Sequence, residues 1–135
     1  EVTLALIEAA ERLGYPYHVG IGYTAASFFC GQARPGYRGY HQSFMDTLVS
    51  DMQAAGVLNF EMEAATVLTL SSLYGLRAGA IFTVVANRVN NAFQYDNSST
   101  DHNIEVANLA MTILWDWEQK KKAAGKKFFF PGLLK

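Results

Sequence analysis

The sequence predicts an α/β fold in which helices alternate with strands. A helical pattern over Val2–Leu13 is followed, after Gly14 and Pro16, by a strand pattern at Tyr17–Ile21. Such a short link between helix and strand is usual in layered α/β domains. The continuous apolar run Arg77–Ala86 is typical of a central parallel strand. We therefore expect a buried sheet covered by helices, with ligands bound at the carboxyl ends of its strands.

The middle of the chain predicts a helix, a strand and a second helix. The first helix spans Gln42–Ala55 and stops at Gly56, because apolar residues recur at helical spacing up to that glycine. The strand spans Val57–Met62. From Glu63 or the residue after it up to Tyr74, the side chains are apolar or small on every side, so we expect a buried helix there.

The C-terminal third predicts a lid, a long helix and a tail. The polar, Asn-rich segment Val89–Thr100 is the candidate for a mobile lid. The last helix is expected to start near Thr100 or Asp101 and to close on the lysines at 120–122, whose charges suit a helix C-terminus. Its expected buried stripe consists of Ile104, Ala107, Met111, Leu114 and either Trp117 or Trp115. The tail carries three consecutive phenylalanines from Phe128, which we expect to pack on a neighbouring surface.

Composition limits the class of protein. With 135 residues, half of them apolar, the chain can bury one sizeable core, so we expect one α/β unit over 1–135 with 120–135 as an extension. The net charge of -1 gives no electrostatic reason to bind nucleic acid or an anionic membrane. No apolar run reaches the roughly 18 residues that span a bilayer. A single cysteine, Cys30, fits a reducing compartment, and we expect a cytoplasmic protein.

Two acids stand inside an otherwise apolar segment. Glu61 and Glu63 alternate within the stretch from Asn59 to Thr66. An unpaired carboxylate sent into a core costs several kcal/mol, so this pair suggests a polar site cut into a buried element. We expect it to converge with two other polar strand ends, the loop carrying Gln32 and Arg34 and the pair Asn87-Arg88.

The loop from Thr24 to Gly39 has the composition of a recognition loop. Gln32 offers an acceptor and two donors, and Arg34 a rigid fork of donors, so together they can read the edge of a planar heterocycle. Phe28 or Phe29 could cover the face of that ring. The alternative is a surface loop anchored by its aromatic residues.

These motifs together resemble the hexameric nucleoside phosphorylase family. The resemblance is carried by Phe28–Arg34, by Asn59–Thr66, and by the run from Gly75 to Arg88, and it extends to about Leu114. It implies a three-layer α/β/α fold with a mixed central sheet, inorganic phosphate as co-substrate, no cofactor, and dimers that assemble into a hexamer. The Phe-x-x-Gly-Gln-x-Arg loop implies uridine as substrate, with uracil and ribose 1-phosphate as products.

The resemblance also implies roles for the base-binding residues. Gln32 and Arg34 would hydrogen-bond the uracil, and Phe28 would stack on the base or the sugar. Arg34 would help catalysis because phosphorolysis leaves negative charge on the departing pyrimidine. Arg88 would support the base pocket from its strand end.

The ribose would be held by the acidic segment. Met62 would pack on the sugar, and Glu63 would accept hydrogen bonds from its 2′ and 3′ hydroxyls, which a carboxylate with two acceptor oxygens matches. Glu63 would thereby position C1′ for phosphate attack. Glu61 would support the substrate site from behind the residues that touch the sugar.

The sequence departs from the family pattern in two ways. Purine-cleaving members carry an Asp after the strand that ends here at Asn87, and no Asp occurs between Glu63 and Tyr95. The glycine-rich phosphate loop and phosphate-binding arginines belong to the first half of the family's chain, and this chain opens inside a helical pattern without an initiator methionine. We therefore expect a C-terminal half whose N-terminal half is missing, and which is inactive alone.

Three interpretations remain open at this point. The first is an enzyme that phosphorolyses uridine, and the second is a nucleoside-binding or assembly module without phosphate chemistry. The third is a purine phosphorylase or a nucleosidase of the same family. Each candidate residue also has a simpler explanation: Glu63 as a helix N-terminal acid, Met62 as core filling, and Arg34 and Arg88 as solvated charges.

Overall fold

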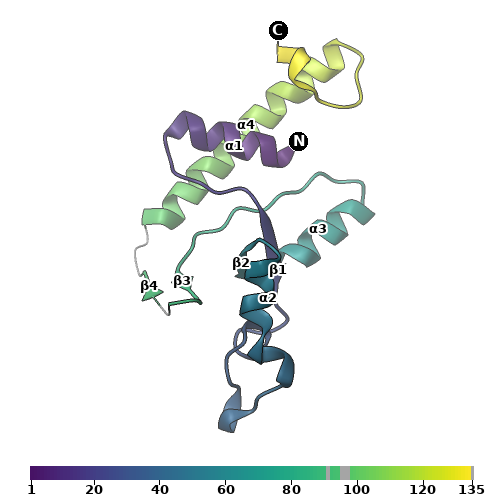
Figure 1. The fold of residues 1–135 in the computed structure, drawn as a ribbon. Helices are drawn as coiled ribbons and strands as arrows, with labels where there is room; N and C mark the ends of the chain where they lie inside the picture. The colour runs from purple at the N-terminus through teal and green to yellow at the C-terminus, as the bar shows by residue number, and fades with distance from the viewer. Residues whose placement is uncertain (91, 95–97, 135) are drawn as a thin grey trace. The chain divides into compact units, whose positions relative to one another are not determined.

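The computed structural model describes residues 1–90, 92–94 and 98–134 (Figure 1). The helices are α1 (Val2–Leu13), α2 (Leu48–Ala54), α3 (Ala64–Leu73) and α4 (Ser98–Ala123). The strands are β1 (Ile21–Thr24), β2 (Val57–Glu61), β3 (Ala86–Asn87) and β4 (Ala92–Phe93). The described residues form two compact units, one from 1–17, 77–83 and 98–134, the other from 18–76, 84–90 and 92–94. None of the helices in these described ranges combines the length and the apolarity needed to cross a membrane.

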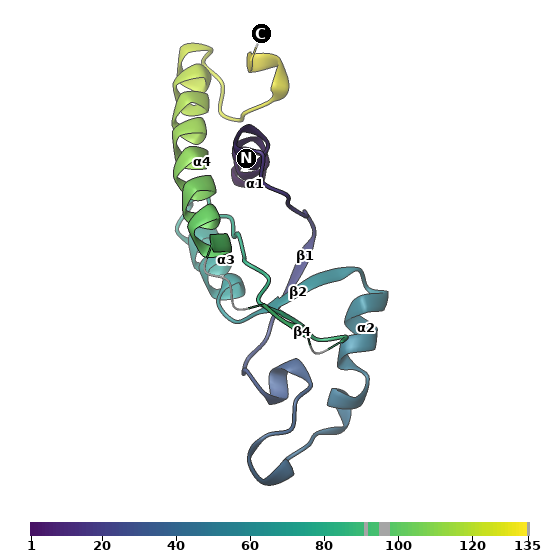
Figure 2. The ribbon, with the colours of Figure 1, turned by 90° about the vertical axis from the view of Figure 1, so that its left-hand side faces the viewer.

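The first unit is built on the packing of α1 against α4, which lie side by side in two perpendicular views (Figures 1 and 2). Its core consists of Ala5, Ala9, Ala10, Val106, Ala110, Ile113 and Trp117. Alanines on α1 allow the two helices to approach closely, and the larger side chains of α4 fill the space between them. The aromatic ring of Phe129, in the segment after α4, stacks on Trp117 with centroids 3.9 Å apart.

The prediction for α1 is confirmed and the predicted stripe of α4 is largely wrong. α1 spans Val2–Leu13 and ends at Gly14, which adopts φ 72°, the left-handed conformation that favours glycine. On α4, Met111 is 69% exposed, and the buried apolar positions are 106, 110, 113 and 117. The helix also begins at Ser98, before the expected Thr100 or Asp101. Of the two tryptophans proposed for the stripe, Trp117 is the buried one.

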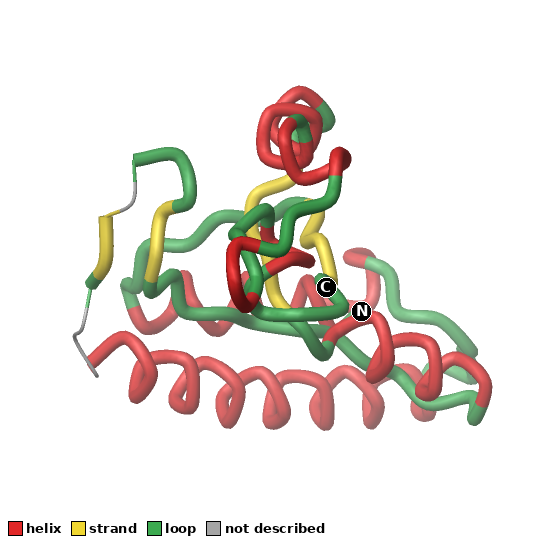
Figure 3. The backbone as a smooth tube through the Cα atoms, turned by 90° about the horizontal axis from the view of Figure 1, so that it is seen from below, coloured by secondary structure: helices red, strands yellow, loops and turns green. Residues whose placement is uncertain are grey.

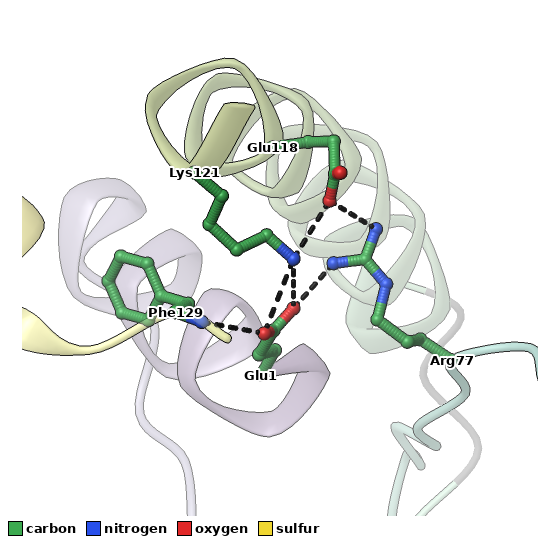
Figure 4. A network of polar contacts seen from close by, with 5 residues as sticks. All are labelled: Glu1, Arg77, Glu118, Lys121 and Phe129. Atoms are coloured by element: carbon green, nitrogen blue, oxygen red, sulfur yellow. Dashed lines mark hydrogen bonds and ion pairs between the residues drawn. The ribbon is translucent and has the colours of Figure 1, made fainter. Parts of the chain in front are cut away.

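The tail of the first unit is held by a network of charges (Figure 4). The Lys121 ammonium is buried, 3.2 Å from a Glu1 oxygen and 2.8 Å from a Glu118 oxygen. Arg77 pairs with the same two carboxylates, and the Phe129 N–H donates to Glu1 at 2.9 Å. Burial would raise the pKa of Glu1, but the bonds from Phe129, Arg77 and Lys121 lower it to about 2. The network therefore ties α1, α4 and the segment after α4 together.

The expectation that the three phenylalanines pack on a neighbouring surface holds for one of them. Phe129 packs against the core, whereas Phe128 is 70% exposed and Phe130 is also exposed. Phe129 is held both through its ring, on Trp117, and through its backbone N–H, on Glu1.

The second unit is built on the parallel pairing of β1 and β2, one of the two strand pairs coloured in Figure 3. The register places Tyr23 beside Phe60 and Thr24 beside Glu61. Strand β2 starts at Val57, as predicted, after the left-handed Gly56 turns the chain out of α2. The predicted strand at Tyr17–Ile21 is wrong, since pairing begins only at Ile21.

Two expectations about helices in this unit need correction. The helix predicted over Gln42–Ala55 is divided into a 3-10 turn, Ser43–Asp46, and the short α2. α3 lies within its predicted range, but none of its residues is buried within the described part of the chain. A helix that is apolar on all sides needs a covering layer on all sides, and the described residues cover only part of it.

The strand predicted over Arg77–Ala86 is also wrong over most of its length. Residues 77–85 are not in a strand, and only Ala86–Asn87 pairs, antiparallel with β4. Residues 91 and 95–97 of the predicted lid Val89–Thr100 lie outside the described residues. The described strands thus include one parallel and one antiparallel pair, and the predicted α/β class is confirmed.

Candidate functional site

The predicted recognition loop folds back on the Arg34 guanidinium. Arg34 follows a 3-10 turn, Cys30–Gln32, and Ala33, which takes the left-handed conformation (φ 58°). Its Nη2 donates to the Phe28 carbonyl oxygen at 2.7 Å, and its guanidinium carbon lies 4.1 Å from the centroid of the Phe28 ring. Since a guanidinium over an aromatic face is attracted by the ring, Phe28 and Arg34 hold each other in place.

Arg88 joins this loop from the end of the second strand pair. Its Nη2 donates to Oε1 of Gln32 at 2.8 Å, and Gln32 is 5% exposed. A guanidinium has donors only, so the amide of Gln32 must turn its oxygen to Arg88, and its NH₂ group lies on the other side. Burial, and the nearby positive charge of Arg34, lower the pKa of Arg88.

One donor in this group has no acceptor among the described residues. The Nε atom of Arg34 is buried and unpartnered there. Buried polar groups are almost always hydrogen-bonded, because leaving one unpaired costs about 1–3 kcal/mol. The described part of the chain thus leaves one donor of the Arg34 guanidinium unsatisfied.

A second polar group lies where β1 and β2 end. Glu61 accepts a hydrogen bond from the Thr24 hydroxyl and two more from the backbone N–H groups of Glu63 and Ala64, at 2.8 and 2.6 Å. Partial burial alone would raise the pKa of Glu61, but the bonds from Thr24, Ala64 and Glu63 bring it below its ordinary value. Glu61 thus stays ionised and caps the first turn of α3.

Glu63 stands at the N-cap position of α3, but its side chain does not cap the helix. Its carboxylate is exposed and receives the Met62 N–H at 3.3 Å, which uses one of about four acceptor positions. The Met62 side chain is 37% exposed and does not fill a core. The two acids of the motif therefore differ: Glu61 is engaged within the chain, and Glu63 faces outward.

All seven predicted site residues lie in the second unit. The structure brings four of them into contact: Phe28, Gln32, Arg34 and Arg88. The acidic segment Glu61–Glu63 is linked to them through β1, which ends at Thr24 beside Glu61 and continues into the loop. The Ala25 N–H also donates to the Glu61 carbonyl oxygen at 2.7 Å.

Sequence reasoning missed Thr24. Its hydroxyl contacts both Glu61 and the backbone of α3, 37 and 41 positions further along the chain. No local pattern marks it, because both partners are brought to it by strand pairing.

The fold agrees with a comparison against known protein families. A model of the family described as the Phosphorylase superfamily matches residues 1–115. The chain therefore belongs to the Phosphorylase superfamily.

The chain is also similar to individual enzymes. The chain is 51% identical over 133 residues to the uridine phosphorylase of Thermococcus kodakarensis, a match that covers 98% of this chain and 47% of that protein. It is 42% identical over 89 residues to the uridine phosphorylase of Escherichia coli, covering 65% of this chain and 35% of that protein. It is 52% identical over 84 residues to the guanosine phosphorylase of Halorubrum lacusprofundi, covering 62% of this chain and 30% of that protein. The chain thus spans about half the length, or less, of the curated relatives it matches.

Proposed function

We propose that this chain forms the nucleoside-binding part of an enzyme that cleaves uridine with inorganic phosphate, giving uracil and ribose 1-phosphate. The observation that carries the proposal is the donor-rich group of Gln32, Arg34 and Arg88 beside the Phe28 ring. The relatives named uridine phosphorylase support the same reaction.

The base site fits the charge that the reaction creates. Phosphorolysis forms a bond between a phosphate oxygen and C1′ and breaks the bond from C1′ to N1, and its electron pair leaves with the uracil ring. Donors that face the uracil carbonyl oxygens stabilise this charge most in the transition state. The Gln32 NH₂ group would be a donor of that kind, and the Arg34 guanidinium would add positive charge beside it. Phe28 would cover the face of the ring.

The ribose would be bound by the segment after β2. Glu63 has free acceptor capacity for the 2′ and 3′ hydroxyls, and the exposed Met62 offers an apolar surface for the sugar. Glu61 would support the residues that touch the sugar and would not bind the sugar itself, because its carboxylate already accepts three hydrogen bonds from its own chain. Holding the ribose in this way orients C1′ toward phosphate.

The complete reaction needs a phosphate site, which we propose lies on polypeptide outside residues 1–135. The chain spans 47% of the Thermococcus relative, so a phosphate-binding half of comparable size would complete it. On this proposal residues 1–135 alone are inactive, no cofactor is needed, and the enzyme works in the cytoplasm as a homo-oligomer, with dimers that assemble into a hexamer.

The test is phosphate-dependent release of uracil by the protein expressed from its full coding region. Arg34→Ala and Glu63→Ala should each lower kcat/KM for uridine by tenfold or more, since each removes a polar partner worth about 1–3 kcal/mol. Arg38→Ala and Asp51→Ala, which change exposed charges of the same unit, are the matched controls. Uridine turnover within a fewfold of the parent enzyme in both site variants would disprove the site.

A guanosine-specific enzyme is the second candidate, because the guanosine phosphorylase relative is 52% identical over its matched region. Uridine, guanosine and adenosine should be compared at equal phosphate. The Gln32 and Arg34 pair predicts preference for uridine, whereas faster turnover of guanosine would favour the second candidate. The absence of an Asp between Glu63 and Tyr95, where purine-cleaving members carry one after the strand that ends here at Asn87, also favours uridine.

A further inference from the structure

The hydroxyl of Thr24 uses both its donor and its accepting capacity inside the site. It donates to Oε1 of Glu61 and accepts the Ala65 N–H at 3.0 Å. The β1–β2 register places Thr24 directly beside Glu61, so the two side chains meet across the strand pair. Nothing in the reaction proposed above uses this hydroxyl.

Thr24 and Glu61 together satisfy the first turn of α3. Glu61 accepts the N–H groups of Glu63 and Ala64, and Thr24 accepts the next, from Ala65. The first N–H groups of a helix have no partner within the helix, so outside acceptors fix where the helix begins. The residue fixed here is Glu63, at the N-cap.

We propose that Thr24 is a positioning residue, whose hydroxyl, through Glu61 and the first turn of α3, sets the direction in which Glu63 presents its carboxylate to the ribose. The inference rests on the proposed function, because it assigns Glu63 to the sugar hydroxyls. The role of the Glu61 carboxylate would then be to orient the first turn of α3, and with it Glu63. Its lowered pKa fits this role, since a protonated Glu61 would accept fewer of the three bonds.

A hydroxyl that only stabilises α3 would lower the amount of folded protein without changing how Glu63 acts. If the hydroxyl positions Glu63, removing it must instead lower activity only when Glu63 is present. The test is therefore a double-mutant cycle in the protein expressed from its full coding region, with uridine phosphorolysis measured per folded active site.

Thr24→Val keeps the shape of the side chain and removes the hydroxyl, and Thr24→Ser keeps the hydroxyl. We expect Thr24→Val to lower kcat/KM for uridine about tenfold and Thr24→Ser to recover most of it. In the Glu63→Ala background, assayed at raised enzyme concentration, Thr24→Val should change kcat/KM less than twofold. Thr69→Val, on the exposed part of α3, is the control for loss of a threonine hydroxyl.

The inference is overturned if Thr24→Val stays within twofold of the parent enzyme, or if it costs the same with and without Glu63. If Thr24→Val does not fold, Glu61→Gln replaces it in the same cycle and the same two results decide. A parent enzyme that releases no uracil from uridine, or a Glu63→Ala variant with full activity, would instead count against the proposed function. The two failures are therefore distinguishable.

Discussion

Arg88 donates a 2.8 Å hydrogen bond to the amide oxygen of Gln32, a residue 56 positions earlier in the chain. The bond fixes the orientation of the amide, because an arginine can only donate. It follows that the NH₂ group of Gln32 faces away from Arg88. The amide can then donate to a carbonyl oxygen of a bound ring.

Arg88→Met should therefore weaken recognition of the base. The variant frees the Gln32 amide to turn over, and the buried oxygen of Gln32 loses its donor, a change worth about 1–3 kcal/mol. We expect KM for uridine to rise about tenfold or more, with a smaller change in kcat. Steady-state kinetics of uracil release would measure both, with Arg38→Met, an exposed arginine of the same unit, as control. An unchanged KM would show that Arg88 does not orient the amide.

Glu61→Gln should destabilise the protein in a pH-dependent way. The folded pKa of Glu61 lies below its ordinary value of 4.5, so its stabilising contribution is full above that pH and is lost as the pH falls through the folded pKa. At pH 7 we expect the variant to lose about 1–3 kcal/mol of unfolding free energy. Urea unfolding between pH 7 and pH 3 should show the difference from the parent protein shrinking. Asp116→Asn, which removes an exposed acid on α4, is the control for loss of a carboxylate charge.

Lys121→Met should destabilise the first unit. The substitution leaves the Glu1 and Glu118 carboxylates with fewer cationic partners, and both are partly exposed, so we expect a loss of about 1–3 kcal/mol, less than for a fully buried pair. Lys122→Met changes the neighbouring exposed lysine and should stay within about 0.5 kcal/mol of the parent. Equal unfolding midpoints for the two variants would refute a stabilising role for the network.

Phe129→Ala should cost far more stability than Phe128→Ala. Phe129 stacks on Trp117, whereas Phe128 is 70% exposed. We expect the first to lower the unfolding free energy by about 2–3 kcal/mol, somewhat below a full core Phe→Ala, and the second by less than about 1 kcal/mol. Thermal unfolding monitored by circular dichroism would compare them. Similar losses in both variants would mean that the stack does not anchor the tail.

The elements that the sequence predicted well have boundaries that are set by their own residues. α1 has a complete apolar stripe and a glycine that can take the left-handed conformation, so both its face and its end are local properties. Strand β2 likewise follows a glycine turn at Gly56. For these elements no distant partner is needed to choose the structure.

The wrong predictions concern burial and pairing, which depend on partners far away in the sequence. α4 has apolar residues on more than one face, and the face it buries is decided by α1, not by its own periodicity. The run Arg77–Ala86 has strand composition but needs a neighbour to form a ladder, and in the described residues only its last position pairs, as part of β3.

In the candidate site, too, local sequence predicted some features, whereas others depend on distant parts of the chain. The sequence motifs predicted Gln32, Arg34, Glu61 and Glu63 as site residues, because polar groups in apolar surroundings are easy to recognise in a sequence. The bond from Arg88 to Gln32 and the role of Thr24 depend on which segments fold together, so residue order alone did not predict them.

The stack of Phe129 on Trp117 gives the protein a built-in optical signal. The chain has two tryptophans: Trp117 is buried beneath the tail, and Trp115 is 64% exposed. Emission from Trp117 should be shifted to the blue and shielded from acrylamide, whereas emission from Trp115 should be red and readily quenched. Release of the tail can therefore be followed as a loss of the shielded, blue-shifted fluorescence, without attaching a dye.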